Sequence, residues 1–238
     1  MINLEFDPLL HQYTINGDPA VSVTRLIHSY CHPFEADEHA ERIGSRDGKT
    51  AEQVKKEWND AGELAADRGT DIHAAADDLI RQAITGEINT IAYMSGPMAA
   101  LMKFIEDHGE LIGSTDVWPE QRLCHSEYRV AGTTDLICNL DGLRTVLDWK
   151  AIKNIEVLGY GNKVMYSPCN HLLDTNYNHY ALQLNCYRVM LIDYYDYTPE
   201  QLVLIHLGSN GKYERYNMPV WEDLARKIMS KGERPRKK

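Results

Sequence analysis

Three acids and one lysine stand at strand positions in the second half of the chain. They are Glu120 in the predicted strand 117–123, Asp135 in the predicted strand 128–139, and Asp148 and Lys150 at the end of the predicted strand 144–150. Residues two apart in a strand point to the same face, so Asp148 and Lys150 project together and Trp149 faces the other way. Taken alone, that pair is most simply a surface ion pair, which contributes little to stability.

The neighbouring residues change this interpretation. Asp135 precedes Leu136-Ile137 and Asp148 follows Val146-Leu147, so both carboxylates adjoin apolar strand residues, where an unpaired charge is costly. Neighbouring carboxylates repel and require a cation, and oxygen ligands suit Mg²⁺ or Mn²⁺. A charged lysine is no ligand, but it can hold an attacking water or offset charge on a phosphorane-like transition state. The pattern indicates metal-assisted phosphodiester hydrolysis.

Two outlying segments complete the pattern, Arg68-Gly69-Thr70-Asp71-Ile72-His73 and Tyr180-Ala181-Leu182-Gln183-Leu184-Asn185-Cys186-Tyr187. Between these two segments lie Glu120, Gly132-Thr133-Thr134-Asp135 and Asp148-Trp149-Lys150. Together, and in their order along the chain, these motifs resemble the PD-(D/E)XK nuclease superfamily and its RecB-like, phage-type exonuclease branch. Segments 22–24 and 174–180 also resemble phage exonucleases, and the mitochondrial genome maintenance exonuclease and lambda exonuclease are more distant likenesses. The resemblance covers most of residues 12–207.

The resemblance assigns roles to individual residues. Those implied in the metal site are His73, Asp135, Asp148, Glu120 and the backbone carbonyl of Trp149, with Lys150 positioning and activating water. Three residues that share one helix face are implied to support the site and touch the phosphate backbone: Tyr180, Gln183 and Tyr187. Further substrate-binding or supporting residues are Ser22, Thr24, Arg68, Thr133 and Lys153, with Arg25 and Lys163 as other candidates for phosphate contacts.

The implied activity is that of a Mg²⁺-dependent exodeoxyribonuclease in phage DNA replication or recombination, with one or two ions and Mn²⁺ as a substitute. DNA is the expected partner, with a single-strand annealing protein or other recombination proteins, and a homo-oligomer is compatible with relatives that form rings. No cysteine follows Cys186, so no iron–sulfur cluster is expected. The alternatives are an endonuclease and a catalytically inactive nucleic-acid- or partner-binding protein of the same fold.

Some residues have competing interpretations. His73 can be a core histidine, Tyr180 and Tyr187 can be core aromatics, and Glu127 can replace Glu120 as the third acid. A zinc site from His28, Cys31 and His32 is weighed against a loop with incidental polar residues, which is favoured because no second ligand pair has zinc-like spacing. The chain has five cysteines, an odd number at wide spacing. This pattern favours a cytoplasmic protein with reduced thiols. For a phage-encoded protein, that compartment is the cytoplasm of the host cell.

The elements expected from the pattern give an α/β (α+β) fold, a restriction-endonuclease-like core with a mixed sheet flanked by helices. The predicted division is a hairpin and helical region carrying the histidine (1–112), the nuclease core (113–230) and a basic tail (231–238). The N-terminal part is expected to form a hairpin at 3–15, an Asn16-Gly17 turn and a helix that begins at Ser22. Further helices are expected at 50–83, 97–109, 178–195 and 219–229, and the first of these is two helices if Gly62 and Gly69 break it. A loop is expected at 153–176, with strands at 202–207 and 213–216.

Composition sets the outer limits. The chain has 238 residues and a net charge of 25 − 35 = −10. No apolar run approaches the roughly 18 residues of a membrane span, and the N-terminus does not read as a signal peptide. Residues 226–238 hold seven basic residues and one acid, a segment that can contact DNA or remain a solvated terminus. An even spread of the acid excess would argue against binding phosphate backbones.

Overall fold

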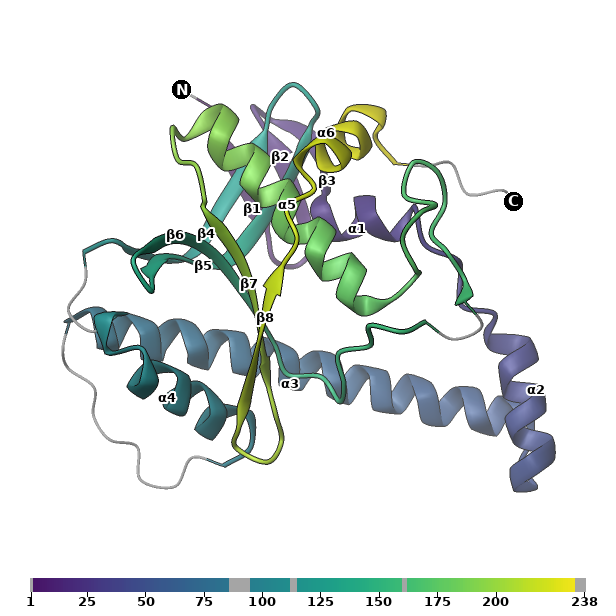
Figure 1. Cartoon of the computed structure of the whole chain (residues 1–238). Coiled ribbons are helices and arrows are strands. Elements are labelled where there is room, and N and C mark those ends of the chain that lie inside the picture. Colours follow the sequence, from purple (N-terminus) through teal and green to yellow (C-terminus); the bar gives the residue numbers. More distant parts are fainter. Residues whose placement is uncertain (1, 86–94, 112–114, 160–161, 234–238) are drawn as a thin grey trace.

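The computed structural model describes residues 2–85, 95–111, 115–159 and 162–233, with the side chains of residues 63–70 left out. It is an α/β structure in which helices flank a mixed, eight-stranded sheet (Figure 1). Along one path the strands run in the order β1-β2-β3-β5-β6-β7-β8, and β4 pairs with β5. The predicted α/β class and mixed sheet are therefore confirmed. Within the described residues, no helix combines the length and apolar character needed to cross a membrane.

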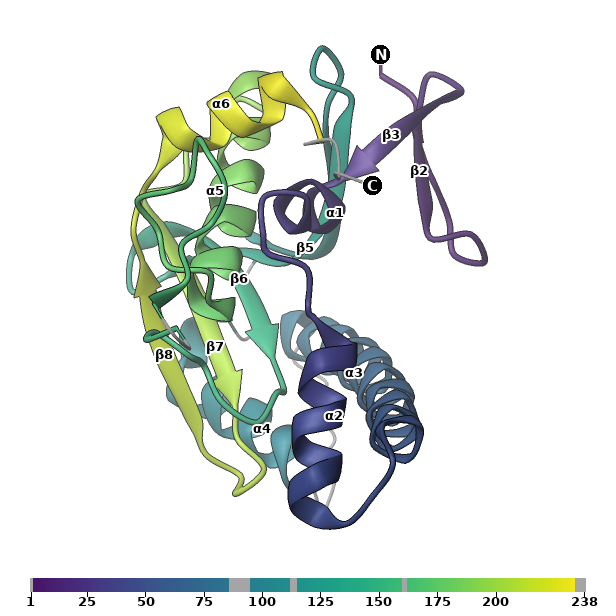
Figure 2. The ribbon, with the colours of Figure 1, turned by 90° about the vertical axis from the view of Figure 1, so that its right-hand side faces the viewer.

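The N-terminal hairpin has a third strand that the sequence analysis missed. The three strands are β1 (Leu4–Asp7), β2 (Gln12–Ile15) and β3 (Asp18–Ser22). The predicted Asn16-Gly17 turn lies between β2 and β3, with φ values of 54° and 85° that suit these two residue types. Pro19 in β3 argued against a strand. β3 nevertheless pairs in parallel with β5, which joins the hairpin, set to one side in Figure 2, to the main sheet.

Two of the three N-terminal helices begin where the sequence places caps. The three helices are α1 (Val23–His28), α2 (Ala36–Asp47) and α3 (Ala51–Thr85). The Ser22 hydroxyl accepts the Arg25 N–H at 3.2 Å, as expected for the cap of α1. Thr50 and Gln53 form a reciprocal capping box, because each side chain accepts the other's backbone N–H, at 2.8 and 3.2 Å. Helix α2 was not predicted.

Helix α3 runs unbroken for 35 residues, so the division at Gly62 and Gly69 into two helices is wrong. Each glycine costs a helix about 1 kcal/mol relative to alanine. The second half of α3 buries Ala76, Leu79 and Ile80 against the sheet layer. Burying one large aliphatic side chain contributes about 1.5–3 kcal/mol, so this apolar face offsets the glycines and keeps His73 on a continuous helix.

The central strands lie close to the ranges predicted from the sequence. They are β4 (Val117–His125), β5 (Val130–Leu140), β6 (Leu143–Lys150), β7 (Gln201–Leu207) and β8 (Tyr213–Met218). Asp141-Gly142 makes the tight turn between β5 and β6, as predicted. β6 pairs in parallel with β7, while the β4–β5, β5–β6 and β7–β8 pairs are antiparallel.

Helices cover both faces of this sheet. The remaining helices are α4 (Pro97–Asp107), the short 3₁₀ helix η1 (Gly109–Leu111), α5 (Asn176–Tyr194) and α6 (Glu222–Lys231). Helices α3 and α4 pack on one face, and α1, α5 and α6 on the other (Figure 1). Trp149 belongs to the α3–α4 core, as the strand alternation predicts. Helix α6 begins three residues after the predicted residue 219, beyond Pro219 and Val220.

Candidate metal centre

Residues from four elements meet near the middle of the sheet, where α3 approaches it. His73 comes from α3, Glu120 from β4, Asp135 from β5, and Asp148 with Lys150 from β6. One ligand atom each from His73, Glu120 and Asp135 lies within 4.8 Å of the others. Imidazole and carboxylate groups at this spacing can hold a metal ion. Residues 47 and 15 positions apart in the sequence (120 − 73 and 135 − 120) thus share one site.

A break in the β4–β5 ladder presents Glu120. The ladder pairs Pro119 with Leu136 and Gln121 with Thr134, so Glu120 falls opposite Asp135 between these two pairs. Its backbone has a φ of 48°. A non-glycine residue in this left-handed region costs about 1–3 kcal/mol and persists only where surrounding structure enforces it. The strained residue is the one that brings the third acid to Asp135.

Asp135 occupies the place where β5 and β6 separate. Their ladder ends at Leu136 and Leu147. The Trp149 backbone N–H donates to Asp135 Oδ2 at 2.8 Å, and His73 Nδ1 lies 3.1 Å from Asp135 Oδ1. Both carboxylate oxygens are thereby oriented, although each keeps a second lone pair for a ligand. The implied role of the Trp149 carbonyl stays a prediction.

The second buried acid, Asp148, is held by residues from two elements. It is 1% exposed. Gln183 Nε2 donates to Asp148 Oδ1 at 3.3 Å and to the Tyr187 hydroxyl at 3.1 Å. The Lys150 ammonium forms an ion pair with Asp148 Oδ2. Lys150 Nζ also lies 5.1 Å from the centroid of the Tyr180 ring. The predicted helix face of α5 therefore contacts the acids.

The electrostatics of this cluster are those of a site short of positive charge. Burial, and next the neighbouring Asp135, raise the pKa of Glu120 to about 7 and that of Asp148 to about 6. Burial also opposes ionisation of Asp135, but His73, Lys150 and the Trp149 N–H outweigh it and lower the pKa of that carboxyl. Asp135 is thus the carboxylate that stays charged most readily.

The pKa values of the two cationic groups are also raised, which for these groups favours the charged form. Burial disfavours the charged form of Lys150, but Asp148 and Asp135 outweigh it and raise the pKa of the ammonium. Burial is likewise the largest effect on His73, and the hydrogen bond to Asp135 overcomes it, so the His73 pKa is raised. Lys150 remains protonated at neutral pH, and among the described side chains of the cluster it is the one permanent cation beside three carboxyl groups. A divalent ion can balance the excess negative charge of such a site.

Several other predicted residues lie around the centre. Thr133 Oγ1 is 2.9 Å from the Tyr13 hydroxyl, which ties the N-terminal hairpin to β5 two residues before Asp135. Ser22 caps α1 and sits beside Ala131 in the β3–β5 ladder. The structure brings neither hydroxyl into contact with the acids. Their predicted substrate contacts stay predictions.

The remaining residues predicted to contact substrate are exposed, paired with other groups or outside the described residues. Lys153, Lys163 and Thr24 are exposed. Arg25 is paired with Glu233, at 2.7 Å. The Arg68 side chain lies outside the described residues, as do residues 234–238 of the basic tail. Glu127, the alternative third acid, is exposed in the β4–β5 turn, where its backbone N–H meets the Tyr194 hydroxyl. Of the two glutamates, Glu120 is the one beside Asp135.

Two contributors were missed by sequence reasoning. Asp77 lies one helical turn after His73, and its charge acts on Glu120. Its Oδ1 is buried without a hydrogen bond in the described structure, and Arg81 pairs with this carboxylate. The i, i+4 spacing of His73, Asp77 and Arg81 was a usable signal. The second contributor is Tyr13. Its partner Thr133 lies 120 residues later in the sequence, so no local sequence pattern could indicate this contact.

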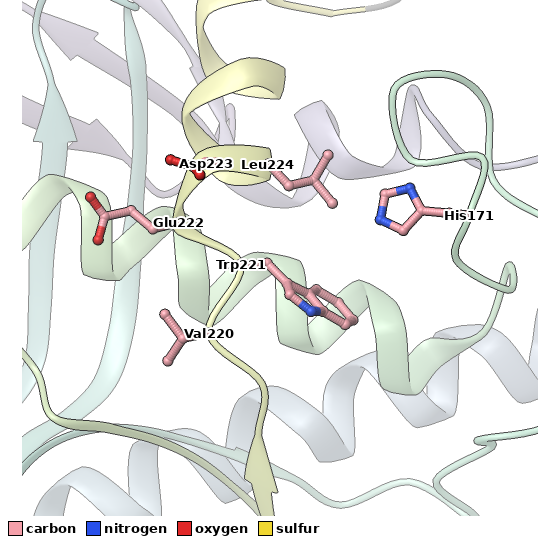
Figure 3. A pocket seen from close by; sticks show the side chains of 6 residues that line it. All are labelled: His171, Val220, Trp221, Glu222, Asp223 and Leu224. Atoms are coloured by element: carbon pink, nitrogen blue, oxygen red, sulfur yellow. The ribbon is translucent and has the colours of Figure 1, made fainter.

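A hollow in the described structure lies away from the candidate metal centre. A cavity of about 560 Å³ opens at the start of α6, lined by His171, Val220, Trp221, Glu222, Asp223 and Leu224 (Figure 3). In the close-up, His171 faces Trp221 and Leu224, whereas Glu222 points to the other side of the segment that connects β8 to α6. None of these residues belongs to the centre.

Comparison with known proteins adds no assignment. No protein-family model matches the chain, and no curated protein matches it. The functional argument therefore rests on the residues and their geometry.

Proposed function

We propose that the chain is a divalent-metal-dependent DNA nuclease, and in particular an exonuclease. The observation that carries the proposal is the convergence of His73, Glu120 and Asp135. Beside them, the buried Asp148 interacts with Asp135 and is paired with Lys150. A site that only binds a metal gains nothing from a lysine, because its charge repels the cation. A lysine among metal-binding acids is useful when the substrate is itself an anion.

The donor set fits Mg²⁺ or Mn²⁺. Carboxylate oxygens are their preferred ligands, and one imidazole is compatible with Mn²⁺. The raised pKa values of Glu120 and Asp148 are what a carboxylate cluster shows when it holds less positive than negative charge. His73, Glu120, Asp135 and Asp148 would hold the ion. When bound, the ion supplies positive charge against phosphate oxygens and a more acidic water.

The chain's own residues account for the remaining requirements. Lys150 keeps its proton and presents N–H donors at the edge of the cluster, where they can orient an attacking water and oppose charge developing on phosphorus. Gln183 fixes Asp148, and Tyr187 fixes Gln183. The Tyr180 ring lies against the lysine and limits where its ammonium can point. These contacts restrict the reacting groups to one geometry, which is a large part of catalysis.

DNA cleavage tests this proposal directly. Linear duplex labelled separately at its 5′ and 3′ ends and closed-circular duplex are incubated with the chain and Mg²⁺. We expect digestion of the linear DNA, sparing of the circles, and loss of activity in chelator and in Asp135→Asn. Glu127→Gln is the matched control, because it removes an exposed acid outside the cluster. Cutting of the circles would make the enzyme an endonuclease.

The competing function has a distinct result. DNA binding by the wild-type chain without cleavage in either Mg²⁺ or Mn²⁺ would identify a binding protein of this fold. Full cleavage by Asp135→Asn would place the chemistry at another site.

A further inference from the structure

A second cluster of metal-ligating side chains lies apart from the candidate metal centre. It joins Cys31, just after α1, with Asp174, just before α5, and His179 in the first turns of α5. Cys31 Sγ is 3.1 Å from His179 Nε2, which is 2.7 Å from Asp174 Oδ1. One ligand atom from each residue lies within 4.8 Å of the other two. All three side chains are half-buried.

The geometry favours ligand convergence over a catalytic relay. In a Cys-His-Asp relay the thiol and the carboxylate contact different ring nitrogens. Here the same nitrogen, His179 Nε2, faces both Cys31 and Asp174. Tetrahedral zinc at ordinary bond lengths separates sulfur, nitrogen and oxygen ligands by about 3.3–3.6 Å. To admit the ion, the Cys31–His179 separation must open by about 0.5 Å and the His179–Asp174 separation by about 0.7 Å.

Further groups fit the surroundings of such a site. The Asp174 Oδ2 atom accepts the His32 backbone N–H at 2.6 Å, which orients the carboxylate from behind, as outer-shell partners do in metal sites. The His28 ring is edge-on to that of His179, with centroids 6.2 Å apart. His28 is one candidate for a fourth ligand, a position that water can also fill.

The cluster lies at the end of a long, largely irregular connection. Residues 151–159 and 163–175, between β6 and α5, form no helix or named strand, and an isolated bridge joins Val164 to Leu173. Irregular segments of this length are uncommon in compact domains unless something holds them. Two other bonds already tie this segment to the end of α1: Tyr166 N–H to the Tyr30 carbonyl at 2.7 Å, and His32 Nε2 to the Val164 carbonyl at 3.0 Å.

We propose that Cys31, Asp174 and His179 bind a structural Zn²⁺ ion that clamps this connection to the end of α1. Thiolate and imidazole ligands select zinc over Mg²⁺. On binding, the Cys31 thiol releases its proton to solvent as the zinc–sulfur bond forms, and His179 donates its Nε2 lone pair with the ring proton on Nδ1. No group is oxidised or reduced.

The clamp would bear on the candidate metal centre through one helix. His179 and Gln183 are four residues apart on α5, and Gln183 donates to Asp148. Fixing the start of α5 therefore fixes the residue that holds this acid. The zinc site itself does not depend on the proposed nuclease activity.

Cobalt substitution tests the proposal on the full chain. After chelator treatment and removal of the chelator, the protein is titrated with Co²⁺ alone. A thiolate ligand gives cobalt an intense near-ultraviolet charge-transfer band, which carboxylate and imidazole ligands cannot produce. We expect this band to saturate at one equivalent, to disappear on adding Zn²⁺, and to be lost in Cys31→Ala and His179→Ala.

Two controls separate this site from other metal-binding groups. Cys138→Ala removes a buried thiol of the opposite core and leaves the band. Asp135→Asn alters the candidate metal centre and also leaves it. Absence of the band in the wild-type chain, or its survival in Cys31→Ala, would overturn the proposal and leave a hydrogen-bonded cluster.

A measurement on the wild-type chain guards against misfolded variants. Cys31 is half-buried, whereas the other four cysteines are buried, so native-state alkylation reports mainly on Cys31. One equivalent of Zn²⁺ is expected to slow this alkylation at least tenfold. An unchanged rate would contradict the proposal.

Discussion

Replacing Glu120 with glutamine is expected to stabilise the metal-free protein and to weaken its response to metal. Glutamine keeps the shape of the side chain and removes its charge. Burial and the neighbouring Asp135 raise the pKa of Glu120 from 4.5 to about 7. A pKa difference of this size corresponds to about 3 kcal/mol of free energy opposing the charged form in the folded state.

The pH dependence follows from the direction of this shift. Between pH 4.5 and 7 the folded state keeps a proton on Glu120 that the unfolded chain releases, so stability falls as the pH rises through this window. Above pH 7 the full penalty is present. Metal-free Glu120→Gln is therefore expected to equal the wild type near pH 4.5 and to exceed it at pH 8 by at most about 3 kcal/mol. For a chain of this length that is a melting-temperature rise of up to about 6–12 °C.

Metal should close or reverse this difference. At a free concentration a hundred times its dissociation constant, an ion that binds only the folded state contributes about 2.7 kcal/mol. The wild type receives this stabilisation, whereas the glutamine variant lacks one charged ligand and gains less. The assay is thermal unfolding at pH 5 and pH 8, each in chelator and in excess Mg²⁺.

Exposed Glu127 supplies the matched control, since Glu127→Gln removes the same charge without touching the cluster. It is expected to change stability by no more than about 0.5 kcal/mol under every condition. The reasoning is refuted if Glu120→Gln is less stable than the wild type in chelator at pH 8, or if both gain equally from Mg²⁺.

Three other substitutions probe separate parts of the argument. Lys150→Met should lower the rate of DNA cleavage by about 100-fold or more, measured with end-labelled DNA, because it removes the cation facing the developing phosphate charge; unchanged turnover would exclude that role. Gly132→Ala should destabilise the chain by about 1–3 kcal/mol in urea unfolding, because the new Cβ would lie 2.8 Å from Tyr187 Cε1; a neutral result would mean that the ring moves freely. Thr50→Ala breaks the capping box with Gln53 and should cost about 1 kcal/mol by thermal unfolding, with no effect on metal response.

Local rules accounted for much of the fold. Short runs rich in strand-forming residues indicated β4 to β8, and Thr50 indicated the start of α3. These features depend on neighbours in the sequence, which is why they are readable there. Helix α2 lies beyond that reach, because neither a side-chain cap nor a broad buried face marks it: its only buried residues are Ala40 and Gly44.

The candidate site was predictable as a set of residues but not as a geometry. Strand position indicated Asp135, Asp148 and Lys150, whereas the left-handed backbone that presents Glu120 depends on the paired strand. The cysteine cluster shows the same limit. Spacing grouped His28, Cys31 and His32 as possible zinc ligands, but the partners that meet Cys31 lie more than 140 residues later in the chain.

The net charge of −10 takes on a different meaning once the charges are placed. The guanidinium groups of Arg25 and Arg226 are held by carboxylates of the chain itself, Glu233 for the first and Asp193 and Glu222 for the second. They are poor sources of attraction for a phosphate backbone. The carboxylates at the candidate metal centre are concentrated in one place and face a single lysine, so the same groups that repel DNA in the metal-free chain are those that would bind a divalent ion. If the chain is a nuclease, one binding event then supplies stability, local positive charge and reactivity together, and folding stability and DNA affinity must rise over the same range of Mg²⁺ concentration.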